Sequence, residues 1–236
     1  MHATTLYTIT DQERMAHAVN YFAWQARLVA PQLGQRVIEV GCGIGNFTHT
    51  LLDREIILAV DVDRACVERL RKRYPDRPNL HSFVCEPGSA AFADLARRRP
   101  DSCVCLNVLE HIEDDALALQ AMASVLVPGG VVVLLAPAFQ ALYGHIDRNL
   151  GHHRRYSRAA LAALAHRAGL RIEKLHYVNA PGFIGWWINA RIFRRQAQSA
   201  RQIRLFDGCI VPWLSRLEAI VPPPFGQSLL AVLRKP

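Results

Sequence analysis

Several features that would assign this chain to a class at once are missing from its sequence. The six cysteines form no CxxC pair and no regular framework, so neither a zinc site nor a disulfide scaffold is expected. The longest apolar stretch, Ala121 to Phe139, is interrupted by Pro128-Gly129-Gly130 and is too short on either side to span a bilayer. The N-terminal segment MHATTLYTITDQER has no apolar run typical of a secretory signal. These absences predict a reduced, cytoplasmic protein.

Size and charge narrow the possibilities only a little. The chain has 236 residues, 51% of them hydrophobic, and no repeat or low-complexity tract divides it, so we expect one domain over residues 1–236. The formal net charge of +8 favours an anionic partner, which can be nucleic acid, a phospholipid surface or an acidic substrate. A generally basic surface without any such partner explains the charge equally well.

Short apolar segments alternate with helical patterns along the chain. In the N-terminal segment 1–34, Thr10 and Glu13 have capping-box spacing, which predicts one helix that begins near Thr10 and ends at Pro31. Asp63 and Ser157 are predicted caps of later helices, and further helices are predicted over residues 46–53, 89–99 and 114–126. Strands are predicted over residues 36–40, 56–62, 80–86, 102–108, 131–136, 170–178 and 228–236. This alternation predicts an α/β fold with a parallel sheet and helices on both faces.

Three glycines follow the first predicted strand in the segment VIEVGCGIGNFT. Gly41, Gly43 and Gly45 come where the strand ends, the edge of a parallel sheet at which ligands bind, and they let the backbone approach a ligand closely. Their spacing, GxGxG, differs from the GxGxxG of dinucleotide sites. Glu39, two residues before Gly41, would repel a pyrophosphate but suits the ammonium group of an amino acid.

Two further acids end the next two predicted strands. Asp61 is placed to accept the protons of two ribose hydroxyls, and Glu86 can accept from the exocyclic amine of adenine. One cofactor combines adenosine, an ammonium group and a sulfonium group without any phosphate. These positions therefore favour S-adenosylmethionine.

The segments VIEVGCGIGNFT, AVDVD, CLNVLEHIEDD and LVPGGVVVLLAP resemble, in order and spacing, the motifs of class I S-adenosylmethionine-dependent methyltransferases. The resemblance covers roughly residues 35–178. It implies a Rossmann-like seven-stranded sheet whose last strand is antiparallel, with S-adenosylmethionine as cofactor and no metal. It also implies cofactor contacts from Glu39, Gly41 and Gly43, with Cys42 and Gly45 in the same loop, from Asp61 and Val62 at the ribose, from Glu86 at the adenine, and from Asn107, Val108 and Leu109 beside the methyl group. Glu86 departs from the family pattern, in which aspartate is commoner.

The cofactor leaves the methyl acceptor open. Because the sulfonium already activates the methyl group, the protein mainly positions a nucleophile and excludes water, although a hydroxyl acceptor benefits from a base. His111 follows the fourth predicted strand beside the expected methyl position, where a packing role is the alternative.

The segment LYGHIDRNLGHHRRYS, residues 142–157, concentrates titratable and anion-binding groups after the fifth predicted strand. Similar GHxRRYS segments occur in a bacterial subgroup of these methyltransferases. The expected roles are a base at His152 or His145, an orienting group at Tyr156 and an anion clamp at Arg154 or Arg155. An ordinary solvated loop is the alternative.

Residues 180–227, before the last predicted strand, mix tryptophans with arginines and predict a helical cap inserted into the domain. Trp186 and Trp187 are its candidate substrate contacts. The cap can pack over the substrate pocket or form a homodimer contact. Alternatively, it meets an anionic membrane at the inner face and admits a lipidic acceptor.

The sequence therefore predicts methyl transfer to a small, hydrophobic or acidic metabolite, at oxygen. A nucleic-acid methyltransferase is the first alternative, suggested by the charge. The segment NVLE after the fourth strand lacks the Asn/Asp-Pro-Pro-aromatic turn of enzymes that methylate base nitrogens, and no RNA-binding module is visible, so no nucleic acid is expected. A protein that binds S-adenosylmethionine without transferring its methyl group is the second.

Overall fold

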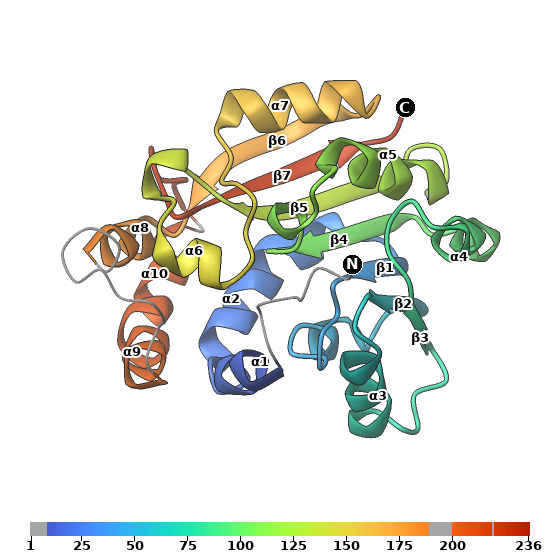
Figure 1. Ribbon diagram of the computed structural model, residues 1–236, viewed down its shortest axis with the longest axis horizontal. Helices are drawn as coiled ribbons and strands as arrows, with labels where there is room; N and C mark the ends of the chain where they lie inside the picture. The colour runs from blue at the N-terminus through green and yellow to red at the C-terminus, as the bar shows by residue number, and fades with distance from the viewer. Residues whose placement is uncertain (1–8, 189–199, 219) are drawn as a thin grey trace.

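A seven-stranded sheet forms the centre of the molecule, seen in Figure 1 of the computed structural model, which describes residues 9–188, 200–218 and 220–236. The strands lie in the order β3-β2-β1-β4-β5-β7-β6. They are β1 (Arg36–Val40), β2 (Ile56–Asp61), β3 (Leu80–Val84), β4 (Ser102–Leu106), β5 (Val131–Pro137), β6 (Arg171–Val178) and β7 (Ser228–Arg234). The last strand, β7, is antiparallel to both β5 and β6, whereas β1 to β5 pair in parallel. The predicted fold class is confirmed.

Helices cover both faces of this sheet (Figure 1). Phe92, Leu119 and Leu161 bury one face, and Trp24 and Val211 contribute to the core on the other. The helices are α1 (Ile9–Met15), α2 (Val19–Val29), α3 (Arg64–Arg73), α4 (Ala90–Ala93), α5 (Asp115–Val125), α6 (His145–Asn149), α7 (Arg158–Arg167), α8 (Ala180–Trp187), α9 (Ala200–Leu205) and α10 (Val211–Glu218). No helix among the described residues is long and apolar enough to cross a membrane.

The structure confirms two of the predicted helix caps but shortens two of the predicted helices. The caps at Asp63 and Ser157 are confirmed, because each side chain accepts a backbone N–H in the first turn of its helix. The predicted helix over residues 46–53 is only a short 3-10 turn, Thr48–Leu51. The one predicted over residues 89–99 is α4 followed by a 3-10 turn.

The single N-terminal helix predicted from Thr10 to Pro31 is wrong, because the chain breaks into α1 and α2 at residues 16–18. Ala18 precedes α2 and offers no side-chain cap. Instead the Asp207 carboxylate, between α9 and α10, accepts from the backbone N–H of Tyr21 at 2.8 Å and of Asn20 at 3.3 Å. A carboxylate at this end satisfies unpaired N–H groups and opposes the helix dipole. No local sequence signal predicts this cap, since its residue is far away in the chain.

The predicted cap, residues 180–227, contributes α8, α9, a π-helical turn (Phe206–Ile210) and α10. Residues 189–199 and 219 of it lie outside the described residues. In Figure 1, α8 and α9 lie with α6 at one side of the sheet. The boundaries of this insertion, and of the single domain over 1–236, stay predictions.

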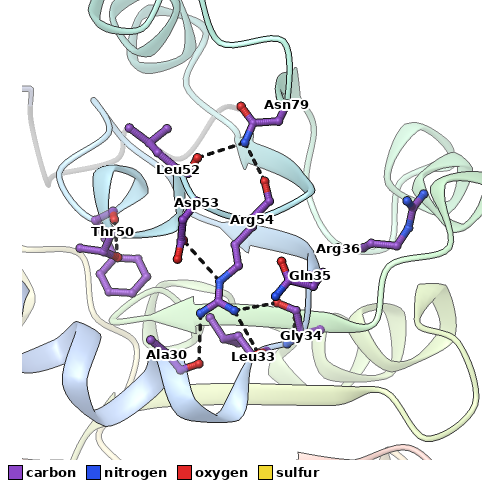
Figure 2. Close-up of polar contacts among 12 residues, drawn as sticks. Ala30, Leu33, Gly34, Gln35, Arg36, Thr50, Leu52, Asp53, Arg54 and Asn79 are labelled. Atoms are coloured by element: carbon purple, nitrogen blue, oxygen red, sulfur yellow. Dashed lines mark hydrogen bonds and ion pairs between the residues drawn. The ribbon is translucent and has the colours of Figure 1, made fainter.

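At the other end of α2, Arg54 fixes the helix to the loop before β2 (Figure 2). Its guanidinium donates to the backbone carbonyls of Ala30, Leu33 and Gly34 at 3.2–3.4 Å, and its Nε lies 3.6 Å from Asp53. A cation suits the C-terminal end of a helix, where carbonyls lack intrahelical partners. Arg54 therefore ties the helix that borders the ligand cavity to the sheet.

Replacing Arg54 with methionine is expected to lower the free energy of unfolding by about 1.5–3 kcal/mol, because charged hydrogen bonds to partly buried carbonyls are lost. Arg97→Met is the matched control, since the Arg97 side chain is 82% exposed and pairs with the exposed surface residue Asp94 three positions earlier; its cost should stay below about 0.5 kcal/mol. Urea denaturation measures both. Equal losses in the two variants would contradict the role given to Arg54.

Candidate functional site

A cavity of about 1070 Å³ lies at the carboxyl ends of β1, β2 and β4. It lies where the strand order reverses between β1 and β4, the expected ligand position in such a sheet. Cavities for drug-sized ligands measure about 300–1,000 Å³, so this one has room for a cofactor and an acceptor together. The glycine loop and strand-end acids form one part of its wall, and histidines and aromatic side chains form the other.

The glycine loop is shaped by positive φ angles. Gly41 and Gly43 border the cavity with φ of +77° and +51°, and a Cβ on them would collide with Val108 and Gln12, respectively. Both therefore need to be glycine. Gly45 is different: it does not line the cavity, and a Cβ there would meet Leu70 on α3. Gly45 is predicted above to contact the cofactor, but in the structure it allows close packing against α3 instead.

Glu39 is a buried carboxylate at the base of this loop. Its Oε2 accepts from the Thr48 hydroxyl at 2.7 Å. Burial raises the pKa of Glu39 to about 8; the Thr48 hydrogen bond lowers it, and the negative charge of Asp61 raises it further. In the ligand-free protein at pH 7 this group is therefore mostly protonated, and a nearby cation would ionise it.

Asp61 organises the loop from the end of β2. Its Oδ2 accepts from the Gly43 N–H at 2.8 Å and its Oδ1 from the Asp63 N–H at 2.9 Å. Burial raises the pKa of Asp61, while these backbone hydrogen bonds act in the opposite direction. Each oxygen keeps a second lone pair, so both can still accept a hydroxyl proton.

The other predicted cofactor residues divide into two groups. Leu109 is 1% exposed and packs in the hydrophobic core. It does not line the cavity, so a direct contact between Leu109 and the cofactor is not supported. The residues that do border it are Cys42, Val62, Glu86, Asn107 and Val108.

Four residues form a polar wall at the cavity that the glycine loop also borders. His152 Nδ1 lies 3.0 Å from Asp147 Oδ1, and its Nε2 lies 4.0 Å from Glu110 Oε1. The ring of His111 packs edge-on against that of His152, with centroids 4.7 Å apart. Glu110, His111 and His152 line the cavity, and Asp147 is buried behind them.

Burial sets the direction of the pKa shift at Glu110 and His111 of this wall, but not at Asp147. It raises the pKa of Glu110 to about 7, although the charges of His152 and Arg155 oppose the shift. It lowers the pKa of His111 to about 4, against a hydrogen bond with the backbone of Gly151. Burial also raises the pKa of Asp147, but hydrogen bonds from His152 and Arg155 and the arginine charge outweigh it and lower the pKa overall.

Arg155 and Trp186 connect the wall to the cap. Arg155 is buried, donates to Asp147 at 2.7 Å and to the Ala138 carbonyl at 3.2 Å, and lies 4.5 Å from the Trp186 ring centroid. Both residues line the cavity. Because the charge of Arg155 is already paired, its predicted role as an anion clamp is not supported.

Four other predicted site residues lie away from the cavity. His145 is exposed and contacts Arg148, and Trp187 is 46% exposed. Arg154 pairs with Asp115 at 2.8 Å. Tyr156 is 3% exposed and donates its hydroxyl to Asp115 as well, so it anchors the loop to α5. The structure therefore does not support roles for His145, Arg154 and Tyr156 as base, clamp and orienting group in this cavity. Trp187 lines a separate apolar cavity with Leu142 and Phe183, so its substrate contact stays a prediction.

The N-terminal helices supply cavity residues that sequence reasoning missed. Gln12 on α1 accepts from the Ile44 N–H at 2.9 Å, so it holds the glycine loop. Tyr21 on α2 also borders the cavity; burial raises the pKa of this phenol to about 12, and a hydrogen bond with Asn107 opposes the shift. Glu110 was visible within LEHI, but a carboxylate next to histidine carries no distinctive spacing.

This sheet order, glycine loop and pair of strand-end acids define a class I S-adenosylmethionine-dependent methyltransferase, which confirms the resemblance. A family model described as a methyltransferase domain matches residues 7–175, and the chain belongs to this family. Its cofactor is S-adenosylmethionine. The likeness of the GHxRRYS segment to a bacterial subgroup stays a prediction.

Curated relatives cover part of the chain. A Mycolicibacterium smegmatis protein described as an S-adenosylmethionine-dependent methyltransferase is 31% identical over 150 residues, 62% of this chain and 56% of that protein. A ubiquinone biosynthesis O-methyltransferase of Alkalilimnicola ehrlichii is 31% identical over 108 residues, 42% of this chain and 40% of that one. The matches thus span roughly half of the relatives' lengths.

Solved structures share the fold at lower identity. The N-methyltransferase NodS of Bradyrhizobium japonicum, in complex with S-adenosylhomocysteine, has a TM-score of 0.53 and 19% identity over 85% of this chain and 77% of its own. The [4+2]-cyclase SpnF has a TM-score of 0.59 and 18% identity over 90% of this chain and 80% of its own. These two proteins are named for different activities, so the fold by itself does not define the acceptor.

Proposed function

We propose that this protein transfers the methyl group of S-adenosylmethionine to a hydroxyl oxygen of a small acceptor with an apolar body. The observation that carries this proposal is the Asp147–His152 pair, because His152 lines the same cavity as the glycine loop. In the reaction the acceptor oxygen bonds to the methyl carbon as the carbon–sulfur bond breaks, which leaves S-adenosylhomocysteine and a proton. Because Asp147 holds Nδ1 of His152, we assign activation of the hydroxyl to Nε2.

The acceptor end of the cavity favours an apolar molecule over an acidic one. Trp186, Ile203 and Phe206 from the cap line it. Arg154 and Arg155 are paired with Asp115 and Asp147, so neither offers an uncompensated charge to an acidic group. The match to ubiquinone biosynthesis O-methyltransferases supports oxygen as the methylated atom.

We assign the cofactor's amino-acid portion to Glu39 and the glycine loop, and its ribose to Asp61. Since ligand-free Glu39 has a pKa of about 8, pairing its ionised form with the cofactor ammonium releases a proton at pH 7. The affinity for S-adenosylhomocysteine should therefore rise with pH, by up to about tenfold per unit between pH 6 and 8, and then level off.

Calorimetry in two buffers of different ionisation enthalpy measures both the affinity and the released proton. Glu39→Gln is the control, because an amide cannot ionise, and its weaker binding should not change over this pH range. Wild-type binding that neither rises with pH nor releases a proton would refute the assignment of Glu39 to the ammonium.

His152→Ala should slow single-turnover methyl transfer by about 10²- to 10⁴-fold, the usual contribution of a positioned acid–base group, while S-adenosylhomocysteine binds as before. Labelled S-adenosylmethionine with a panel of apolar phenols and catechols provides the assay. His166→Ala, an exposed histidine on α7, is the matched control. Unchanged transfer in His152→Ala would remove the histidine from the mechanism.

We also propose that the outer surface of the cap contacts anionic membrane, where an apolar acceptor would enter. Trp213 and Leu217 on α10 are 72% and 68% exposed, and the Arg216 guanidinium lies 5.8 Å from the Trp213 ring centroid. Such apolar and cationic side chains suit an anionic lipid interface.

Co-sedimentation with vesicles that contain phosphatidylglycerol should detect this contact, and Trp213→Ala combined with Leu217→Ala should weaken it several-fold. Leu117→Ala is the control, because Leu117 is also exposed, at 54%, but lies on α5 outside the cap. Equal binding by the wild type and the double variant would rule out this surface.

A further inference from the structure

Three side chains in the cavity wall form a set of donors that suits a metal ion. Glu110, His111 and His152 each offer one ligand atom, and the three atoms lie within 4.8 Å of one another. Bonds of about 2.1 Å place two ligands of one ion about 3–4.2 Å apart, so side-chain adjustments of less than about 1 Å would bring the set together. No other group of three such side chains is found among the described residues, and all three of these line the cavity.

The carboxylate of Glu110 is the second, independent sign of a ligand. Glu110 is fully buried, and neither of its oxygens has a hydrogen-bond partner within the described part of the chain. Nε2 of His152 lies 4.0 Å from Oε1, which is too far for a hydrogen bond. A buried acid without a partner costs free energy, and a cation between Glu110 and His152 would remove that cost.

Hydrogen bonds orient the imidazole rings of His111 and His152 in the way that is usual for histidines that bind a metal ion. A ligating histidine commonly gives its other ring nitrogen to a carboxylate or a backbone carbonyl, which sets its orientation. Here Asp147 engages Nδ1 of His152 at 3.0 Å, which leaves Nε2 on the Glu110 side, and the backbone of Gly151 bonds to the ring of His111. Asp147 is in turn fixed by Arg155 and by the Gly144 N–H.

We propose that Glu110, His111 and His152 bind a divalent first-row transition-metal ion. Two imidazoles and one carboxylate suit ions such as Zn²⁺, Mn²⁺, Fe²⁺ and Co²⁺ and leave coordination positions open, whereas Mg²⁺ prefers an all-oxygen set. This inference deepens the proposed function and rests on it for the ion's role. With an ion bound, Nε2 of His152 would be a ligand, and the ion would replace this nitrogen in activating the acceptor. An acceptor hydroxyl at an open position would have a lowered pKa, lose its proton to water and then take the methyl group from the sulfonium.

The test uses the full-length protein, stripped of metal with a chelator. Co²⁺ titration followed by visible absorption, and Zn²⁺ titration by calorimetry, should each show one site per chain, with Mg²⁺ binding far more weakly. Glu110→Gln should lower Zn²⁺ affinity more than 100-fold, and Asp147→Asn, which loosens His152, by about 10- to 100-fold. His166→Ala should leave the affinity unchanged. Binding of S-adenosylhomocysteine reports that each variant is folded.

The outcomes separate this inference from the proposed function. Equal Zn²⁺ affinity in the wild type and Glu110→Gln, or no Co²⁺ absorption band, would overturn the metal site even if methyl transfer to hydroxyl acceptors is observed. One Zn²⁺ site per chain that is lost in Glu110→Gln would establish the metal site. If no hydroxyl acceptor is then methylated, only the proposed function is refuted.

Discussion

The arrangement of the polar wall, where we propose that the methyl acceptor binds, depends on the hydrogen bonds of the buried Asp147 carboxylate. It accepts from His152, from Arg155 and from the backbone of Gly144, so one side chain orients a cavity histidine and closes its own loop. Arg155 then lies over Trp186 of the cap. A charge buried this deeply is tolerated only while its partners stay in place, which makes the whole arrangement rigid. A rigid wall is what an enzyme needs to hold a nucleophile in line with a methyl group.

The protein is basic overall, but its cavity is acidic. Glu39, Asp61 and Glu110 all border the cavity, and burial raises the pKa of each. S-adenosylmethionine bound here would bring an ammonium and a sulfonium close to these acids, so the cofactor would supply positive charge beside them. The net charge of +8 therefore describes the outer surface and gives no guide to the bound molecule.

Sequence reasoning succeeded where function depends on neighbours in the chain. Strand, glycine turn and terminal acid follow one another from Arg36 to Asp61, and local physics predicts both strands and the turn, although the helix expected over residues 46–53 is only a 3-10 turn. Prediction from the sequence failed where a residue's role depends on contacts between distant segments. Tyr156 and Arg154 look like site residues in GHHRRYS, yet both turn to Asp115 on α5. Only the folded chain shows which polar groups in a dense loop are already paired.

The same dependence on distant residues affects how the molecule is assembled. The backbone of Asn20 is capped by Asp207, 187 positions later in the chain. On a ribosome, α2 emerges long before the residue that completes its first turn has been made. The glycine loop, its acids and the polar wall all precede the cap in the chain, whereas the aromatic lining at Trp186 and Phe206 comes from the cap itself. A nascent or truncated chain that ends before Asp207 therefore has the cofactor motifs but lacks Asp207, Gln227 and Ser228, which line the cavity.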